Sequence, residues 1–193
     1  MIDSKNVMLA ISNNQVAHKI KHVLTYAGYH VPEICTSGNE AIRHVRLSPP
    51  EILLINFEMH DISGLEAARI VGAENLCSVI LMVGNAQKDY VYDSIKDYDI
   101  TILVKPLNKI SMINTVDIVL QARIRMNNLS RQLEKAKSDL ENRKIIEKAK
   151  GILMKSKYIS EGEAYRRIQK MSMDNRVSMC DVSMRICEYV NKI

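Results

Sequence analysis

Residues 52–69 read ILLINFEMHDISGLEAAR, an apolar run that passes through a polar loop into an amphipathic segment beginning near Ser63. Three further apolar runs occur along the first part of the chain, at 7–11 (VMLAI), 78–83 (SVILMV) and 100–104 (ITILV). All four are continuous rather than alternating, as strands buried on both faces are. They therefore favour a parallel sheet.

Amphipathic segments separate these runs. Ile20 and Leu24 lie one helical turn apart in the first segment, and Ser37 followed by Glu40 forms a capping-box pattern at the start of another. A further strand is expected at about residues 29–34. The pattern predicts an α/β fold with a five-stranded, doubly wound parallel sheet, in which ligands bind at the C-terminal ends of the strands.

The composition bounds the class of protein. With 193 residues, of which 47% are hydrophobic, the chain can form one core of ordinary size and a smaller second unit. The four cysteines show neither a C-x-x-C pair nor histidines at zinc spacing, so we expect buried thiols in a reducing cytosol and no metal or other cofactor. No apolar segment reaches the roughly 18 residues that span a bilayer, and the N-terminus lacks a secretory pattern. The expectation is a cytoplasmic protein without a membrane partner.

The net charge of +5 is unevenly distributed. Residues 1–115, taken as the sheet-forming domain, hold 10 Lys and Arg against 12 Asp and Glu, whereas residues 116–193 hold 17 against 10. The basic character therefore belongs to the C-terminal part. Such an imbalance indicates a polyanionic partner, although a charged surface that only faces water gives the same contrast.

The sequence after about Asn108 is helical throughout, and residues 116–142 carry a regular apolar stripe. Its members follow one another at alternating steps of three and four, as the a and d positions of a left-handed coiled coil do. They are Val119, Ala122, Met126, Leu129, Leu133, Ala136 and Leu140. The stripe predicts a parallel homodimer over about three heptads, while a solitary helix packed against its own domain would carry a similar stripe.

Three short helices are expected over residues 143–193, as a small all-α domain. The first covers residues 143–157, and Gly151 inside it costs up to about 1 kcal/mol against alanine, which indicates close packing there. The second begins at Ser160 and the third at Ser178, because each serine is followed three residues later by an acidic residue. This spacing is typical of helix N-caps.

Several features of the N-terminal part occur together: the order of the apolar runs, the AGY turn at 27–29, the segment NFEMHDISGLEAAR and the pair Lys105-Pro106. Together they resemble the receiver domain of two-component response regulators, over residues 5 to about 122. The resemblance implies an aspartate at the end of the third strand that accepts a phosphoryl group, and two acidic residues after the first strand that hold magnesium. It also implies a Ser or Thr ending the fourth strand, an aromatic residue on the fifth strand and a lysine that helps to engage the phosphate.

This chain departs from the receiver pattern at nearly every one of those positions. The acceptor position holds an amide, the end of the first strand has no carboxylate, and the hydroxyl and aromatic positions are aliphatic. Only the lysine, Lys105, remains. The acceptor position is Asn56, the end of the first strand holds Ser12 and Asn13, the hydroxyl position is Val83 and the aromatic position is Ile102.

Phosphoryl transfer is not expected at such a site. Magnesium favours carboxylate oxygens, and without metal and nucleophile the reaction lacks both its acceptor and its charge stabilisation. Glu58 and Asp61, on the following loop, are the remaining acidic candidates, and Lys105 is expected to hydrogen-bond the loop around Asn56. The predicted role of this domain is contact with a regulatory protein, with dimerisation and structural support as alternatives.

The C-terminal part reads RKIIEKAKGILMKSKYISEGEAYRRIQKMSMDNRVSMCDVSMRICEYV and contains several short elements in order. They are AKG at 149–151, LM at 153–154, EAY at 163–165, and then Met173, Arg176 and Ser178. After a receiver-like part and a coiled-coil segment, these elements resemble the ANTAR domain of the amidase and nitrate transcription antitermination regulators, over about residues 140–190. Ser172 and Ser183 depart from the pattern of that family.

The ANTAR resemblance implies binding to paired hairpins in a leader transcript, which prevents an intrinsic terminator from forming. Basic side chains at helical intervals suit phosphates, and an aromatic ring among them suits an unstacked loop base. The candidate RNA-binding residues are Lys144, Lys148, Lys150, Tyr165, Arg166, Lys170 and Arg176. Lys155 continues the stripe on the first helix, but Lys144 and Lys155 can equally be solvated, and Tyr165 can equally complete the three-helix core.

The leading hypothesis is a dimeric RNA-binding antiterminator. A DNA-binding response regulator is an alternative, but the sequence shows no convincing recognition helix. A protein-interaction module without nucleic-acid binding is another. An enzyme is not expected, because no pair of nucleophile and base, metal cluster or glycine-rich phosphate loop is visible.

Overall fold

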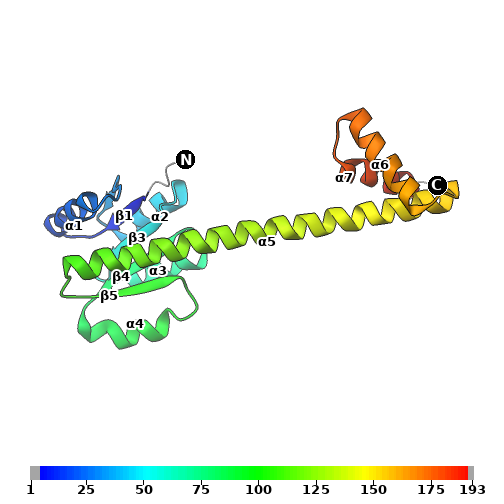
Figure 1. The fold of residues 1–193 in the computed structure, drawn as a ribbon. Helices are drawn as coiled ribbons and strands as arrows, with labels where there is room; N and C mark the ends of the chain where they lie inside the picture. Colours follow the sequence, from blue (N-terminus) through cyan, green and yellow to red (C-terminus); the bar gives the residue numbers. More distant parts are fainter. Residues whose placement is uncertain (1–4, 191–193) are drawn as a thin grey trace. The chain divides into compact units, whose positions relative to one another are not determined.

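The computed structural model describes residues 5–190 (Figure 1), and its contacts divide the chain into two compact units, Met1–Met126 and Asn127–Ile193. In chain order the elements are β1 (Val7–Ala10), α1 (Asn14–Tyr26), β2 (Ile34–Cys35), α2 (Gly38–Leu47), β3 (Ile52–Asn56), α3 (Gly64–Ala73), β4 (Ser78–Val83), the short 3-10 helix η1 (Asn85–Gln87), α4 (Lys88–Ser94), β5 (Ile100–Val104), α5 (Lys109–Lys157), α6 (Glu161–Asn175) and α7 (Met179–Val190). Within the described residues, no helix has both the length and the apolar composition needed to cross a membrane.

The sheet of the first unit is parallel throughout, in the order β2-β1-β3-β4-β5. This confirms the predicted α/β fold with a five-stranded, doubly wound sheet. Because β1 lies between β2 and β3, the direction of winding reverses there. A crevice is expected at the C-terminal ends of β1 and β3, where such folds bind their ligands.

Helices cover both faces of this sheet, which explains why its strands are apolar along their whole length. Val7 and Leu9 of β1 pack in the core beneath α1 and the first part of α5, whereas Met8 and Ala10 pack in the core beneath α2, α3 and α4. Successive side chains of a strand point to opposite faces. Each strand therefore contributes to two hydrophobic cores.

The second predicted strand is shorter than expected. β2 covers only two residues, and an isolated bridge at His30 precedes it. The N–H of Val7 donates to the carbonyl oxygen of His30, and the N–H of Leu9 donates to that of Glu33, so a step of two residues along β1 matches a step of three along its neighbour. The resulting β-bulge contains Pro32, which has no N–H to donate to a neighbouring strand.

The turn between β3 and α3 is tightly packed. The helix begins next to Ser63, as the sequence predicts, and Ser63 Oγ caps α3 by accepting a hydrogen bond from the N–H of Glu66 at 3.1 Å. The next residue must be glycine, because a Cβ at Gly64 would lie 1.9 Å from the carbonyl oxygen of Asn56. This close approach fixes the end of β3, and with it the position of Asn56.

Helix α5 is a single helix of 49 residues. The sequence predicted a coiled-coil segment and a separate short helix, but nothing in the structure interrupts the helix between them. Val116, Val119 and Leu120 of its first part are buried against the sheet. These contacts explain why the first unit extends to Met126 rather than ending at residue 115.

The second unit contains the end of α5 together with α6 and α7. Ala149, Ile168 and Val182, one from each helix, form a small buried core. Gly151 was predicted to mark close packing, and this prediction is wrong. Among the residues that the structure describes, a Cβ placed on Gly151 meets no neighbouring heavy atom within 4 Å.

Both predicted caps of the second unit are confirmed. Ser160 Oγ accepts from the N–H of Glu163 at 3.3 Å at the start of α6. Before α7, Ser178 Oγ accepts from the N–H of Asp181 at 3.0 Å, and the Asp181 carboxylate accepts from the N–H of Ser178 at 3.2 Å. This reciprocal pair satisfies two backbone donors that the helix itself cannot.

Candidate functional site

A small pocket of about 220 Å³ lies in the crevice at the C-terminal ends of β1 and β3. Within it, Lys105 Nζ donates to Asn56 Oδ1 at 2.5 Å, and Asn56 Nδ2 donates to the backbone carbonyl oxygen of Glu58 at 2.9 Å. Both ends of the amide are therefore engaged. Lys105 was expected to hydrogen-bond the loop around Asn56; its bond goes to Asn56 itself, the last residue of β3, and the Asn56 amide in turn bonds the loop at Glu58.

The two positions after the first strand make structural hydrogen bonds. Ser12 Oγ donates to the carbonyl oxygen of Glu58 at 3.4 Å, and Asn13 Oδ1 accepts from the N–H of Val16 at 3.1 Å as the N-cap of α1. Neither side chain supplies the carboxylate oxygens that magnesium prefers, Glu58 is the single acidic residue among the described residues that line the pocket, and the ammonium of Lys105 adds positive charge to it. The pocket therefore does not fit the metal that the receiver pattern implies. Within residues 5–190, no three His, Cys, Asp or Glu side chains cluster as a metal site.

The Asp61 carboxylate, one of the two remaining acidic candidates, has a structural role. It accepts from the backbone N–H of Gly38 at 2.7 Å and of Asn39 at 2.9 Å, at the N-terminal end of α2. Desolvation opposes its charge, but these and further backbone hydrogen bonds outweigh it and hold the pKa of Asp61 well below its ordinary value. Asp61 is thus a second cap for α2 rather than a substitute acceptor.

The switch positions of the receiver pattern are also occupied by side chains without the required chemistry. Val83 is fully buried in the core beneath α2, α3 and α4, and it has no hydroxyl to engage a phosphate. Ile102 is half-buried on β5 and packs against the same core. Nothing at these positions can report a phosphorylated state through a moving hydroxyl or ring.

The apolar stripe on α5 divides into a buried and an exposed part. Val119 is 6% exposed and packs against the sheet, so its prediction as a dimer contact is corrected: it belongs to the core of its own unit. The remaining members lie on the surface of the described chain. They are Ala122, Met126, Leu129, Leu133, Ala136 and Leu140.

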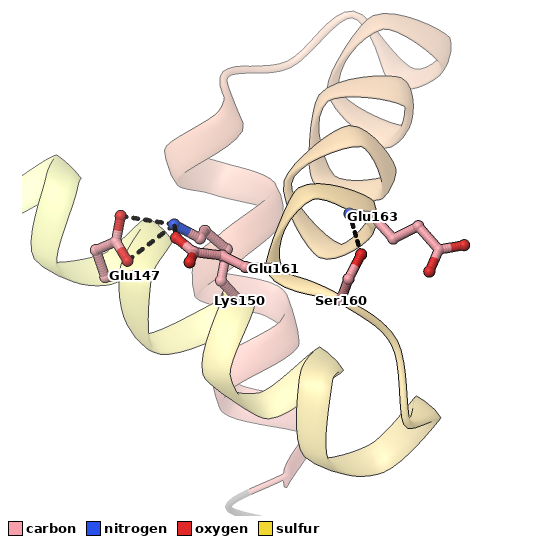
Figure 2. A network of polar contacts seen from close by, with 5 residues as sticks. All are labelled: Glu147, Lys150, Ser160, Glu161 and Glu163. Atoms are coloured by element: carbon pink, nitrogen blue, oxygen red, sulfur yellow. Dashed lines mark hydrogen bonds and ion pairs between the residues drawn. The ribbon is translucent and has the colours of Figure 1, made fainter.

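Figure 2 shows Lys150 of α5 between two glutamates. Its Nζ donates to both carboxylate oxygens of Glu147 at 2.9 Å and to Oε1 of Glu161, the first residue of α6, at 2.7 Å. Lys150 is only 7% exposed, and hydrogen bonds to Glu161 and then to Glu147 raise its pKa. The structure thus argues against Lys150 as a phosphate contact, because RNA would have to displace two carboxylates. The network instead joins the start of α6 to α5.

The other basic candidates are exposed. Lys144 and Lys148 lie one turn apart on α5, and Arg166 and Lys170 lie one turn apart on α6. Lys144 forms an ion pair with Glu141 at 3.0 Å, but both side chains are largely exposed, so the pair is weak. These side chains, with the exposed Lys155, remain predicted RNA contacts.

The α6–α7 link explains two of the sequence features. Arg176 ends α6 in the left-handed conformation, with φ of 53°, and its side chain is exposed. Ser172 Oγ donates to the carbonyl oxygen of Val177 at 2.6 Å, so this departure from the ANTAR pattern has a role in holding the link. Tyr165 is 44% exposed between the buried Ala164 and the basic Arg166, so its ring is accessible to a partner. For Ser183, which is fully buried, the described residues contain no hydrogen-bond partner of Oγ.

Further exposed side chains of the second unit were not predicted as contacts from the sequence. They are the cations Lys157, Arg167 and Arg185 and the ring of Tyr189, which is 70% exposed. The positive balance of residues 116–193 already included these cations, but it could not separate them from the other basic residues. No motif in the sequence singled out Tyr189.

Two family models match the chain. The response regulator receiver domain matches residues 7–117, and the ANTAR domain matches residues 134–186. The transcriptional regulatory protein PdtaR of Mycobacterium tuberculosis is 23% identical over 184 residues, which cover 95% of this chain and 90% of that protein. The nitrate regulatory protein of Klebsiella oxytoca is 38% identical over 66 residues, or 34% of this chain and 17% of that protein.

Solved structures resemble the first unit. A receiver domain of a putative LuxO repressor protein from Vibrio parahaemolyticus aligns with a TM-score of 0.57 at 17% identity, over 65% of this chain and 96% of that one. A structure described as adenylate cyclase from Rhodopirellula baltica aligns with a TM-score of 0.62 at 16% identity, over 68% and 98%. At such identities the likeness shows the fold alone. With the two family matches, however, it leads to one conclusion: the chain belongs to the response regulators that carry a receiver domain followed by an ANTAR domain, a family of transcription regulators.

Proposed function

We propose that this chain binds hairpins in leader transcripts and prevents terminator formation, so that transcription continues. The observation that supports this best is the set of exposed basic side chains on the ANTAR unit, in a region with 17 Lys and Arg against 10 Asp and Glu. RNA phosphates bind to such surfaces with release of counterions. Binding should therefore weaken steeply as salt is added.

The proposed active form is a parallel homodimer through the exposed stripe of α5. With Leu133 and Leu140 at a positions, Asp139 falls at a g position and Lys144 at the e position five residues later. In a parallel pair, Asp139 of one chain faces Lys144 of its partner. An antiparallel pair would bring the basic e positions Lys137 and Lys144 together, which favours the parallel arrangement.

Control is proposed to act through contacts on the receiver domain rather than through aspartyl phosphorylation. The engaged amide of Asn56 and the absence of carboxylates at Ser12 and Asn13 support this. The fold still offers a stable surface to a regulatory protein.

A gel-shift competition tests the proposed RNA binding. A leader RNA with two adjacent hairpins upstream of a terminator is the expected ligand, and an unrelated promoter duplex is the competitor. We expect preference for the RNA, with an affinity that falls as salt rises. Preference for the duplex would favour a DNA-binding regulator. Binding to neither the RNA nor the duplex would favour a protein-interaction module.

Transcription in vitro then tests antitermination itself. Adding the protein to a template that carries the same leader should increase the read-through product. An unchanged ratio of terminated to full-length transcript, with RNA binding intact, would contradict antitermination and leave RNA binding standing.

A further inference from the structure

The second unit contains a groove of about 440 Å³ between the ends of α5, α6 and α7. This volume lies within the range of sites that enclose small ligands. Leu153, Val182 and Ile186 contribute apolar walls, and Tyr189 lies among the lining residues with its ring largely exposed. The three-helix core is small, so this apolar surface is left partly open rather than filled from within.

The charges at the groove have one sign. Among the described residues that line it, the charged side chains are Lys157 and Arg185, both exposed. Within residues 5–190, neither cation forms an ion pair. Asp181, one turn before Arg185, accepts hydrogen bonds from the hydroxyl and N–H of Ser178 at 2.7 and 3.2 Å; these bonds, and then the nearby charge of Arg185, lower the pKa of its carboxyl. The groove therefore combines an apolar interior, an aromatic ring and two positive charges, neither of which is in a salt bridge within residues 5–190.

This combination matches one kind of occupant better than others. An unstacked nucleobase has flat, weakly polar faces and is flanked by phosphates, so it can use the walls, the ring and both cations. An apolar peptide side chain would use the walls but leave Lys157 and Arg185 without partners. Asn175 also lines the groove, and because its Nδ2 donates to the carbonyl oxygen of Met171 at 2.8 Å, the amide offers an acceptor to the edge of a base.

We propose that the groove receives a single unstacked base from the loop of an RNA hairpin. Tyr189 is the stacking surface, and Lys157 and Arg185 contact the phosphates beside that base. The inference rests on the proposed RNA binding and adds residues that the sequence did not single out. It also places loop recognition at the ends of the three helices.

The test uses the full chain and RNA hairpins with a randomised loop, from which binders of the wild-type protein are selected. A fluorescent 2-aminopurine then replaces each loop base in turn. Tyr189→Leu removes the ring, Tyr189→Phe keeps it, and Tyr90→Leu, on α4 of the receiver domain, is a control of similar exposure, at 67% against 70%. The double variant Lys157→Ala with Arg185→Ala removes the cations.

For the wild type, we expect quenching at one loop position on binding. Tyr189→Leu should abolish this quenching and weaken binding about tenfold, whereas Tyr189→Phe and Tyr90→Leu should behave as wild type. The double variant should reduce the salt dependence of binding.

Three other outcomes contradict the proposal. Wild-type binding with no effect of Tyr189→Leu or of the double variant would overturn the groove's role as a base site while RNA binding stands. No wild-type binding at all would overturn both proposals. Altered self-association of Tyr189→Leu without RNA, seen by sedimentation, would instead make the groove an interface between copies and overturn its role as a base site.

Discussion

Lys105 Nζ lies 2.5 Å from Asn56 Oδ1, at the end of the strand where a receiver domain carries its phosphoryl acceptor. The amide of Asn56 also donates to the carbonyl oxygen of Glu58, so the lysine, the amide and the loop are joined by a chain of two hydrogen bonds. In this chain the Lys105 ammonium is bonded to the side chain at the acceptor position, which is itself an amide and not a carboxylate.

Restoring the acceptor alone should not restore phosphorylation. In Asn56→Asp, the new carboxylate would pair with Lys105, and the positions of Ser12 and Asn13 would still lack ligands for magnesium. We expect no phosphorylated species by mass spectrometry after incubation with a small phosphodonor and magnesium. Stable magnesium-dependent labelling of this variant would contradict the account of the pocket.

A matched variant separates metal binding from the acceptor. Adding Ser12→Asp and Asn13→Asp to Asn56→Asp supplies the missing carboxylates, and aspartate at position 13 can still cap α1. This triple variant should gain measurable magnesium binding by calorimetry, whereas Asn56→Asp alone should not.

Two lysines of α5 provide a paired test of the RNA surface. Lys148 is exposed, whereas Lys150 is enclosed by Glu147 and Glu161. Lys148→Ala should lower the slope of log affinity against log salt by about 1, as the loss of one phosphate contact does. Lys150→Met, which keeps the apolar stem, should leave that slope unchanged and lower the melting temperature instead. An equal loss of slope in both variants would return Lys150 to the RNA surface.

The network around Lys150 also predicts a dependence of stability on pH. A hydrogen bond from Lys150 lowers the pKa of Glu161 below its ordinary value of 4.5, so the folded state binds this proton more weakly than the unfolded state. The stabilisation is complete above that pH and is lost as the pH falls through the lower folded-state value. Lys150 acts at the alkaline end of the pH range. Its pKa is raised above the ordinary value of 10.5 in the folded state, so its stabilisation is complete below pH 10.5 and is lost at higher pH.

Glu161→Gln should therefore lower the melting temperature of the full chain near neutral pH. The difference from wild type should begin to shrink as the pH falls below about 4.5, where the unfolded chain takes up this proton, and should vanish once the pH passes the lower folded-state pKa of Glu161. A difference that stays constant into acid would show that Glu161 acts only through its shape.

The sequence predicted the features that depend on residues close together in the chain and failed for those that depend on distant ones. Continuous apolar runs predicted the parallel sheet because two-sided burial leaves a local pattern, and Ser160 and Ser178 predicted helix starts because a cap bonds a residue three positions on. Val119 was misassigned because an apolar stripe is the same whether its partner is the chain's own sheet or a second helix. The enclosure of Lys150 was not predicted, because its second carboxylate partner, on Glu161, comes from another helix. The bulge at Pro32 depends on pairing with β1, which the segment itself does not encode.

Gly151 offers a test of whether the helix end of α5 is shaped for a partner. A Cβ there meets no neighbouring heavy atom within 4 Å, so Gly151→Ala should raise the free energy of unfolding by about 0.5–1 kcal/mol through its higher helix propensity. Denaturant unfolding measures this. Destabilisation would mean that the helices pack more closely than described, and stabilisation with weakened RNA binding would mean that the RNA backbone approaches this glycine.

The exposed stripe of α5 predicts the oligomeric state. Leu133 occupies a central a position and is 55% exposed in one chain, so Leu133→Asp would place a charge in the centre of the proposed dimer seam. Leu47→Asp is the matched control, because Leu47 is 79% exposed on α2, outside the stripe. Sedimentation equilibrium should give a dimer for the wild type and Leu47→Asp and a monomer for Leu133→Asp.

The same variant tests whether the dimer matters for RNA binding. Since two linked hairpins can bind both subunits of a dimer at once, Leu133→Asp should also weaken binding to twin-hairpin RNA by about 100-fold, with little effect on a single hairpin. A monomeric wild type that still prefers twin hairpins would contradict the seam and leave α5 as a helix that serves its own chain alone.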